Sequence, residues 1–272
     1  MTIKLPKWLP ALSCLIAAGV GALILALVAT FYYLKPTLPN VASIREIKLQ
    51  VPLRIFSRDG MLIAQIGEQR RIPVRYADLP DRVIQAFLAA EDDRFFEHPG
   101  IDWQGITRAV LFALGMPGPG GGGSTLTQQL VRTTLIQNEP TIRRKLREVF
   151  LSVTLEDELS KEEILELYLN TVFLGQRAYG VAAAAEIYFG KTLTELTIAE
   201  AALLAGLPQR PSSYNPIASR ELAQGRRAYV LRRMYEQGFI SADERRLALA
   251  EAVSGEPSGP ASSLSAPTSL NW

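Results

Sequence analysis

The sequence is poor in the two residue types that most often build metal and redox sites. Its 272 residues include one cysteine, Cys14, and one histidine, His98. A single cysteine excludes an intramolecular disulfide and a cysteine-rich zinc site, and a single histidine excludes a histidine cluster around a metal. The chain also lacks an excess of positive charge, because 29 lysines and arginines face 27 acidic residues. We therefore expect no nucleic-acid partner, and any anion site must be local.

One long stretch near the N-terminus lacks charge altogether. No charged residue occurs from Leu9 to Leu34. A helix of about 20 apolar residues spans a bilayer, and Tyr32 and Tyr33 are typical of the membrane interface. The pattern predicts a retained transmembrane anchor over residues 9–34. It follows a cytoplasmic tail, residues 1–8, and precedes a stem, residues 35–50.

The rest of the chain has the apolar spacing of a mainly helical domain. Asp59-Gly60 between short apolar runs predicts a β-hairpin. Helices are expected over residues 81–92, 103–114, 125–136, 141–159, 161–170, 178–189, 198–207 and 224–238. Ser160 and Thr141 are the expected caps of two of them. The domain covers residues 51–252, and residues 253–272 have the Ser- and Pro-rich composition of a disordered tail.

Glu91 is the first candidate catalytic acid. It continues a stripe of apolar residues that includes Phe87 and Leu88, so its carboxylate is expected beside an apolar face. Desolvation there would raise the carboxyl pKa toward neutrality, which suits a general acid or base. The alternative is that Glu91 lies at the helix end, reaches solvent and has a structural role only.

Glu148 is the second candidate. The buried stripe of its helix is predicted to consist of Ile142, Leu146, Val149 and Val153. Glu148 then falls on the polar side with Arg144 and Lys145, where it should stay ionised. Five basic and two acidic residues lie between Arg132 and Glu148. Such a stripe suits a phosphate or diphosphate, although a solvated helix face has the same composition.

A glycine-rich loop, Gly115 to Gly123, joins the two regions. Its glycine spacing matches the dinucleotide-binding motif, but that motif follows a β-strand, and no strand is predicted before this loop. A dinucleotide site is therefore not expected. The loop is expected to be flexible. It leads into the first turns of a helix, where hydroxyls and amides can hold sugar or phosphate oxygens. These residues are Ser124, Thr125, Gln128 and Gln129.

Five stretches occur in an order that matches one enzyme family. They are residues 91–100 (EDDRFFEHPG), 123–129 (GSTLTQQ), 144–148 (RKLRE), 161–170 (KEEILELYLN) and 226–234 (RRAYVLRRM). In this set the chain resembles the glycosyltransferase family 51 module of peptidoglycan synthases, closest to the N-terminal half of class A penicillin-binding proteins. The resemblance covers about residues 51–250.

The resemblance implies a lysozyme-like helical fold with a small N-terminal β-hairpin and one transmembrane helix. The catalytic domain would lie on the outer side of the bacterial cytoplasmic membrane. The implied reaction polymerises lipid II into β-1,4-linked glycan with inversion and releases undecaprenyl diphosphate. The implied partners are lipid II, the growing glycan strand, transpeptidases and other wall-synthesis proteins.

The resemblance also assigns roles to residues. Glu91 corresponds to the general base, and Glu148 to a glutamate on the donor diphosphate side, acting directly or through Mg²⁺ or Mn²⁺. Positions that line the substrate sites correspond to Ser124, Thr125, Gln128, Gln129, Arg132, Lys145, Arg147, Asn215 and Arg226. Structural positions of the motifs correspond to Asp92, Phe95, His98, Gly123 and Asn170.

The chain departs from the family pattern in two respects. Thr133 and Pro140 stand where asparagine and arginine are common, which leaves one cationic donor contact absent or supplied by Arg143. The transpeptidase motifs Ser-x-x-Lys and Lys-Thr-Gly are missing, so a monofunctional enzyme without cross-linking activity is expected. Two alternatives remain: a lysozyme-like enzyme that cleaves glycan, and an inactive membrane-anchored scaffold.

Overall fold

The computed structural model describes residues 9–44, 53–56, 58–59, 62–66, 70–116, 123–136 and 142–252. Helices dominate this part of the chain, so the mainly α prediction is confirmed. The α-helices are α1 Leu9–Leu34, α2 Asp81–Glu91, α3 Trp103–Ala113, α4 Leu126–Thr134, α5 Ile142–Glu158, α6 Lys161–Thr171, α7 Val181–Phe189, α8 Ile198–Gly206, α9 Arg220–Glu236 and α10 Ala242–Ala250. The short 3-10 helices are η1 Lys35–Thr37, η2 Val41–Ile44, η3 Tyr76–Asp78, η4 Leu193–Glu195 and η5 Leu207–Gln209.

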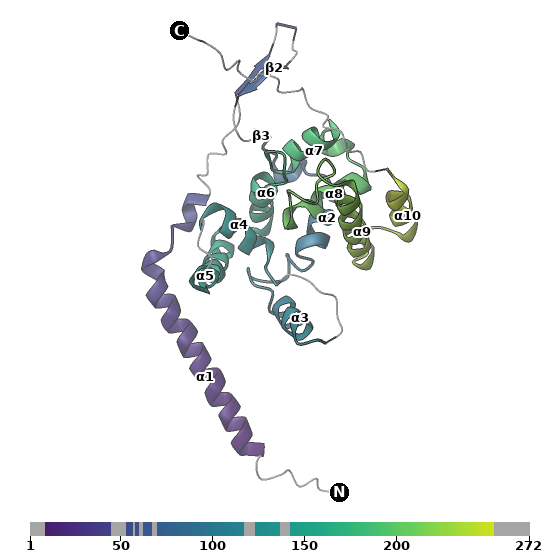
Figure 1. The fold of residues 1–272 in the computed structure, drawn as a ribbon. Helices are drawn as coiled ribbons and strands as arrows, with labels where there is room; N and C mark the ends of the chain where they lie inside the picture. Colours follow the sequence, from purple (N-terminus) through teal and green to yellow (C-terminus); the bar gives the residue numbers. More distant parts are fainter. Residues whose placement is uncertain are drawn as a thin grey trace, which may run out of the picture.

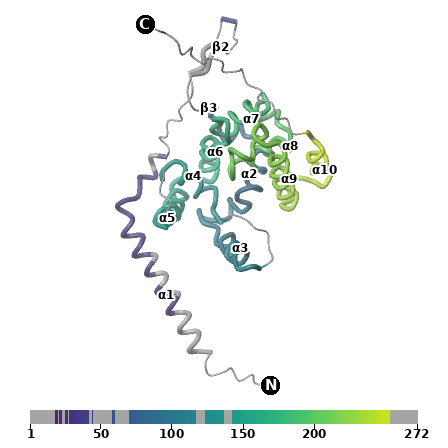
Figure 2. The backbone as a smooth tube through the Cα atoms, in the orientation of Figure 1, coloured from purple at the N-terminus to yellow at the C-terminus, as the bar shows by residue number. Residues whose placement is uncertain are grey.

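Two groups of helices form the body of the molecule (Figures 1 and 2). In one group α2 packs against α8 and α9, and in the other α4 packs against α5 and α6. Phe87 of α2 and Tyr168 of α6 are both buried, and their rings meet edge-to-face with centroids 6.3 Å apart. This contact joins the two groups through one hydrophobic core.

The strands form two small sheets. β1 (Leu53–Phe56) and β2 (Leu62–Ile66) pair antiparallel, and the predicted Asp59-Gly60 turn lies partly outside the described residues. β3 (Arg70–Arg71) pairs in parallel with β4 (Ala178–Tyr179), far along the chain.

β4 corrects the start of one predicted helix. The sequence pattern predicts a helix over residues 178–189, whereas α7 begins only after Gly180. Gly180 has a φ of +87°, and a Cβ at this position would lie 2.9 Å from the carbonyl oxygen of Asn170. A glycine is needed for such a close approach at positive φ, and the chain turns there instead of continuing as helix.

The buried face of α5 is also different from the prediction. Ile142 is 83% exposed and Val153 is 38% exposed, so the predicted apolar stripe does not face the core. The buried residues are Glu148, Leu151, Ser152 and Leu155, which share one face of the helix. Glu148 is therefore on the buried side of α5 and not on its solvated side.

α1 and α3 lie at the margin of the body (Figure 1). α3 buries none of its side chains. Phe31 near the end of α1 meets Phe150 of α5 edge-to-face, with ring centroids 5.1 Å apart. Within the described ranges, no helix has both the length and the apolar composition that crossing a membrane requires. The helix over residues 9–34 is present, but its role as a membrane anchor is not confirmed and stays a prediction.

Helix caps explain several element boundaries. Ser160 starts α6 through a capping box with Glu163, as predicted. Ser241 and Glu244 form another capping box that starts α10, a helix beyond the last one that the sequence pattern predicts. The predicted cap at Thr141, the tails 1–8 and 253–272, and most of the glycine-rich loop lie outside the described residues.

Candidate active site

Glu91 occupies the last position of α2, where its side chain turns toward α4 and α9. Its side chain is only 12% exposed. Oε2 accepts a hydrogen bond of 2.8 Å from Nε2 of Gln129 on α4. Among the described residues, no group hydrogen-bonds the other oxygen, Oε1, and Nη2 of Arg226 on α9 lies 3.7 Å from it. One oxygen is thus held in place, while the other is buried and has acceptor capacity that no hydrogen bond from the described residues uses.

The surroundings of Glu91 oppose its ionisation only in part. Burial is the largest influence, and it raises the pKa of the Glu91 carboxyl above the ordinary value. The hydrogen bond from Gln129 and the positive charges of Arg226 and Arg132 act in the opposite direction. The negative charge of Asp92 adds a smaller upward influence. The net direction is upward, as the apolar stripe before Glu91 predicts.

Glu148 lies in a cluster of cationic side chains on the inner face of α5. Its side chain is 3% exposed, with Nζ of Lys145 at 3.2 Å from Oε2 and Nε of Arg144 at 3.4 Å from Oε1. Lys145 also donates to Oγ of Ser124 at 2.8 Å and approaches Oε1 of Gln128 at 3.4 Å. The charge of Glu148 is therefore met by cations from its own helix, which explains why a carboxylate can be buried here.

α4 connects the surroundings of the two glutamates. Neighbouring residues at its start face different ways, because Gln128 approaches Lys145 while Gln129 bonds Glu91. Thr125 caps α4 in a capping box with Gln128, and its hydroxyl donates to the carbonyl of Gly100 at 2.7 Å. The start of α4 therefore lies between the surroundings of the two acids and contacts both.

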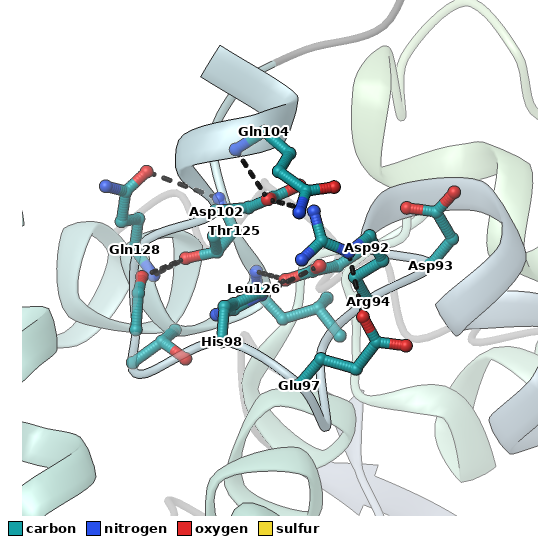
Figure 3. A network of polar contacts seen from close by, with 12 residues as sticks. Asp92, Asp93, Arg94, Glu97, His98, Asp102, Gln104, Thr125, Leu126 and Gln128 are labelled. Atoms are coloured by element: carbon teal, nitrogen blue, oxygen red, sulfur yellow. Dashed lines mark hydrogen bonds and ion pairs between the residues drawn. The ribbon is translucent and has the colours of Figure 1, made fainter. Parts of the chain in front are cut away.

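Asp92 fixes the loop after α2 onto the start of α4, as Figure 3 shows. Its Oδ2 accepts from the backbone N–H of Leu126 at 3.0 Å, and both of its oxygens lie 3.0 Å from Nε2 of His98. Asp92 and His98 are both buried. Lys161 of α6 donates to the carbonyl of His98 at 2.6 Å and lies over the Phe95 ring. These contacts tie the loop after Glu91 to the start of α4.

Comparison with known proteins identifies the family of the chain. A family model described as Transglycosylase matches residues 59–235. The chain belongs to the transglycosylase family.

Two relatives of the chain are both named penicillin-binding protein 1A. The chain is 46% identical over 254 residues to penicillin-binding protein 1A of Escherichia coli, covering 93% of this chain and 29% of that protein. It is 52% identical over 206 residues to penicillin-binding protein 1A of Haemophilus influenzae, covering 76% and 24%. A 2.6 Å crystal structure of the Haemophilus protein matches with 37% identity, a TM-score of 0.45, and coverage of 76% and 21%. The chain spans less than a third of the length of these relatives.

The transglycosylase resemblance assigns further residues, which the structure places in different surroundings. Arg132 is exposed and near enough to influence Glu91. Nη2 of Arg147 donates to Oγ1 of Thr37 in η1, away from Glu148. Asn215 is buried, and its amide bonds the backbone of Pro211 and Ala218. Substrate contacts of Arg147 and Asn215 therefore stay predictions without support from their positions.

The residues assigned as structural in the family motifs lie in supporting positions. Phe95 is fully buried, and the amide of Asn170 pairs with the backbone N–H and carbonyl of Val74 at 2.9 and 2.7 Å. Gly123 comes directly before Ser124 and packs near Ile106 of α3.

Tyr168 is a site residue that the sequence reasoning missed. It lies in the family motif over residues 161–170, but an aromatic residue at helical spacing is typical of a hydrophobic core, so the sequence gives no sign of a role in the site. Its ring is buried, yet its hydroxyl donates to Oε1 of Gln129 at 3.2 Å. A polar atom on a core residue reaches the site only through packing between α4 and α6, which a single sequence does not reveal.

Proposed function

We propose that this transglycosylase domain polymerises lipid II into β-1,4-linked glycan and releases undecaprenyl diphosphate. One observation carries the proposal. A buried carboxylate, Glu91, has one oxygen held by Gln129, and its other oxygen lies beside Arg226 without a hydrogen bond from the described residues. A general base needs this combination of a fixed position, a raised pKa and an oxygen with unused acceptor capacity.

In the proposed reaction, Oε1 of Glu91 takes the proton from the 4-hydroxyl of the acceptor's N-acetylglucosamine. The acceptor oxygen forms a bond to the anomeric carbon of the donor, and the bond from that carbon to the diphosphate breaks on the opposite face. The product has inverted configuration, the leaving group is undecaprenyl diphosphate, and Glu91 returns its proton to solvent. Arg226, 3.7 Å from Oε1, stabilises the ionised base before the transfer.

The cluster of Lys145, Arg144 and Glu148 is the proposed site for the donor diphosphate. Negative charge develops on the leaving group in the transition state, and prepositioned cations stabilise it most effectively where water is excluded. Glu148 keeps Lys145 and Arg144 in place, and Ser124 at 2.8 Å from Lys145 adds a hydroxyl to the same side.

The donor set around Glu148 does not fit a protein-built divalent metal site. Both of its carboxylate oxygens already face cations. In the described part of the chain, no group of three or more His, Cys, Asp and Glu residues is arranged to hold a metal ion. Mg²⁺ and Mn²⁺ prefer several oxygen ligands. We therefore assign the stabilisation of the diphosphate to Lys145 and Arg144 and derive no step through a metal.

We also propose that the domain works at the outer face of the cytoplasmic membrane, held there by residues 9–34. The absence of charge in that stretch supports an anchor. Exposed apolar side chains on and just after α3, including Trp103, Phe112 and Leu114, support a position close to lipid. The proposed partners are the lipid-linked donor, the growing glycan and proteins that cross-link it.

The experiment uses the full chain in detergent micelles with labelled lipid II, with and without EDTA. We expect glycan that a muramidase digests, together with free undecaprenyl diphosphate, and the same rate when EDTA is present. Lipid II that stays intact would contradict the proposal. Release of soluble muropeptides from preformed sacculi would instead support a glycan-cleaving enzyme, and no turnover of either substrate would support a scaffold.

A further inference from the structure

A chain of two hydrogen bonds links the buried face of α6 to the candidate base. The hydroxyl of Tyr168 donates to Oε1 of Gln129 at 3.2 Å, and Nε2 of Gln129 donates to Oε2 of Glu91 at 2.8 Å. Tyr168 is 2% exposed and held by Phe87, whose ring meets it edge-to-face. The hydroxyl therefore has a position set by the core, independent of any ligand at Glu91.

The donors and acceptors in these two hydrogen bonds allow only one arrangement of the Gln129 amide when Glu91 is ionised. A carboxylate only accepts hydrogen bonds, so the NH₂ group of Gln129 must face Glu91. The amide oxygen then faces Tyr168, and the phenol donates to it. Burial, and next the charge of Glu91, raise the pKa of the Tyr168 hydroxyl well above its ordinary value, so it remains a donor throughout the working pH range. With the amide reversed, its oxygen would face Glu91, and Glu91 would have to carry a proton.

We propose that Tyr168 is a positioning residue that holds the Gln129 amide in the orientation favouring the ionised, proton-accepting form of Glu91. The inference rests on the proposed function, because it concerns the same base. Tyr168 touches neither substrate nor Glu91 in this arrangement, and it acts only through Gln129.

The other charged groups around Glu91 limit how far the loss of the Tyr168 hydroxyl can shift the pKa of Glu91. Arg226 on α9 and Arg132 on α4 favour the carboxylate, and Asp92 opposes it. The charged residue of α8, Glu200, is paired with Lys191 at 2.7 Å. These groups stay in place when the Tyr168 hydroxyl is removed. Loss of one neutral hydrogen bond should therefore raise the pKa of Glu91 by about half to one unit.

The test compares Tyr168→Phe with Tyr188→Phe in the full chain in micelles. Tyr188 is a matched control, because it is also buried and its hydroxyl donates to a backbone carbonyl, that of Leu174, at 2.8 Å. The readouts are the ¹³C carboxyl titration of Glu91, assigned by its loss in Glu91→Gln, and the pH profile of lipid II polymerisation. We expect Tyr168→Phe to shift the Glu91 titration and the acidic limb of the profile to higher pH, and Tyr188→Phe to leave both unchanged.

A second measurement covers the case in which Tyr168→Phe does not fold. 3-Fluorotyrosine at position 168 keeps the shape of the ring and makes its hydroxyl a stronger donor, so the titration of Glu91 should move to lower pH. An unshifted titration in the folded variants, or an equal shift in Tyr188→Phe, would overturn the role of Tyr168. An inactive wild type with a shifted titration would contradict the proposed function and leave the hydrogen-bond chain intact.

Discussion

At the scale of single residues, the burial of Glu91 opposes the stability of the fold. The folded state raises the pKa of this carboxyl, so between the ordinary and the raised value the folded chain keeps a proton that the unfolded chain has lost. The associated stability is complete at low pH and is lost as pH rises through the folded pKa. At neutral pH the ionised carboxylate therefore weakens the fold.

Removal of the Glu91 charge should therefore stabilise the fold at neutral pH. Glu91→Gln, which resembles the protonated carboxyl, should raise the thermal unfolding midpoint at neutral pH, and the gain should vanish at about pH 3, where the wild-type carboxyl is protonated in both states. Glu97→Gln, in the same loop with a side chain 65% exposed, is the control and should show no such gain. A lower midpoint for Glu91→Gln at neutral pH would contradict the assigned direction.

The two glutamates also show what sequence can predict at this scale. The apolar surroundings of Glu91 were predictable because Phe87 and Leu88 share its helix face. The burial of Glu148 was not, because the rotation of α5 depends on its packing against α4. A stripe of Arg and Lys around Glu148 looks like a solvated face, and only the fold shows that these cations neutralise a buried acid.

At the scale of elements, the start of α4 depends on groups from other segments. The side chain of Asp92 accepts from the N–H of Leu126 and bonds His98 at the same time. Asp92→Ala would leave both partners buried without this acceptor, so we predict a loss of about 1–3 kcal/mol in the free energy of unfolding, measured by urea denaturation. Polymerisation should fall as well, because Gln129 shifts with α4.

Asp243→Ala provides the control for Asp92→Ala. Asp243 pairs with Arg246 on the surface of α10, and both side chains are at least 75% exposed. Removal of such a pair should leave the urea midpoint unchanged. Equal midpoints for Asp92→Ala and the wild type would show that the α4 start does not depend on Asp92.

Element boundaries were predictable where local chemistry sets them. Ser160 with Glu163 marks the start of α6 in the sequence and in the structure. The same pattern at Ser241 and Glu244 was available for α10 but lacked a strong apolar stripe after it. The break at Gly180 was not predictable from local sequence, because its reason is the close approach of the Asn170 carbonyl at the end of α6.

At the scale of the whole molecule, charged side chains connect α3 to the body. Asp93, directly after Asp92, lies 2.8 Å from Nη2 of Arg233 on α9 and 3.6 Å from Nη2 of Arg108 on α3. α3 buries no side chain of its own. The ion pairs of Asp93 therefore link α3 to α9 across the loop that follows Glu91.

We predict that Asp93→Asn weakens this link selectively. Amide hydrogen exchange in α3 should become faster, while exchange in the buried helix α8 and the thermal midpoint stay close to those of the wild type. Asp243→Asn serves as the control for loss of a surface charge. Faster exchange in all helices, or none in α3, would contradict the assignment of Asp93 as a link between elements.

The central claim is that Glu91 accepts the proton that starts glycan transfer. The most direct measurement is the rate of lipid II polymerisation by the full chain, with Glu91→Gln and Glu97→Gln assayed beside the wild type at one enzyme concentration. The account predicts a fall of about 10²–10⁴-fold or more for Glu91→Gln, the range expected for general base catalysis, and a wild-type rate for Glu97→Gln. A folded Glu91→Gln variant that polymerises lipid II at the wild-type rate would contradict it.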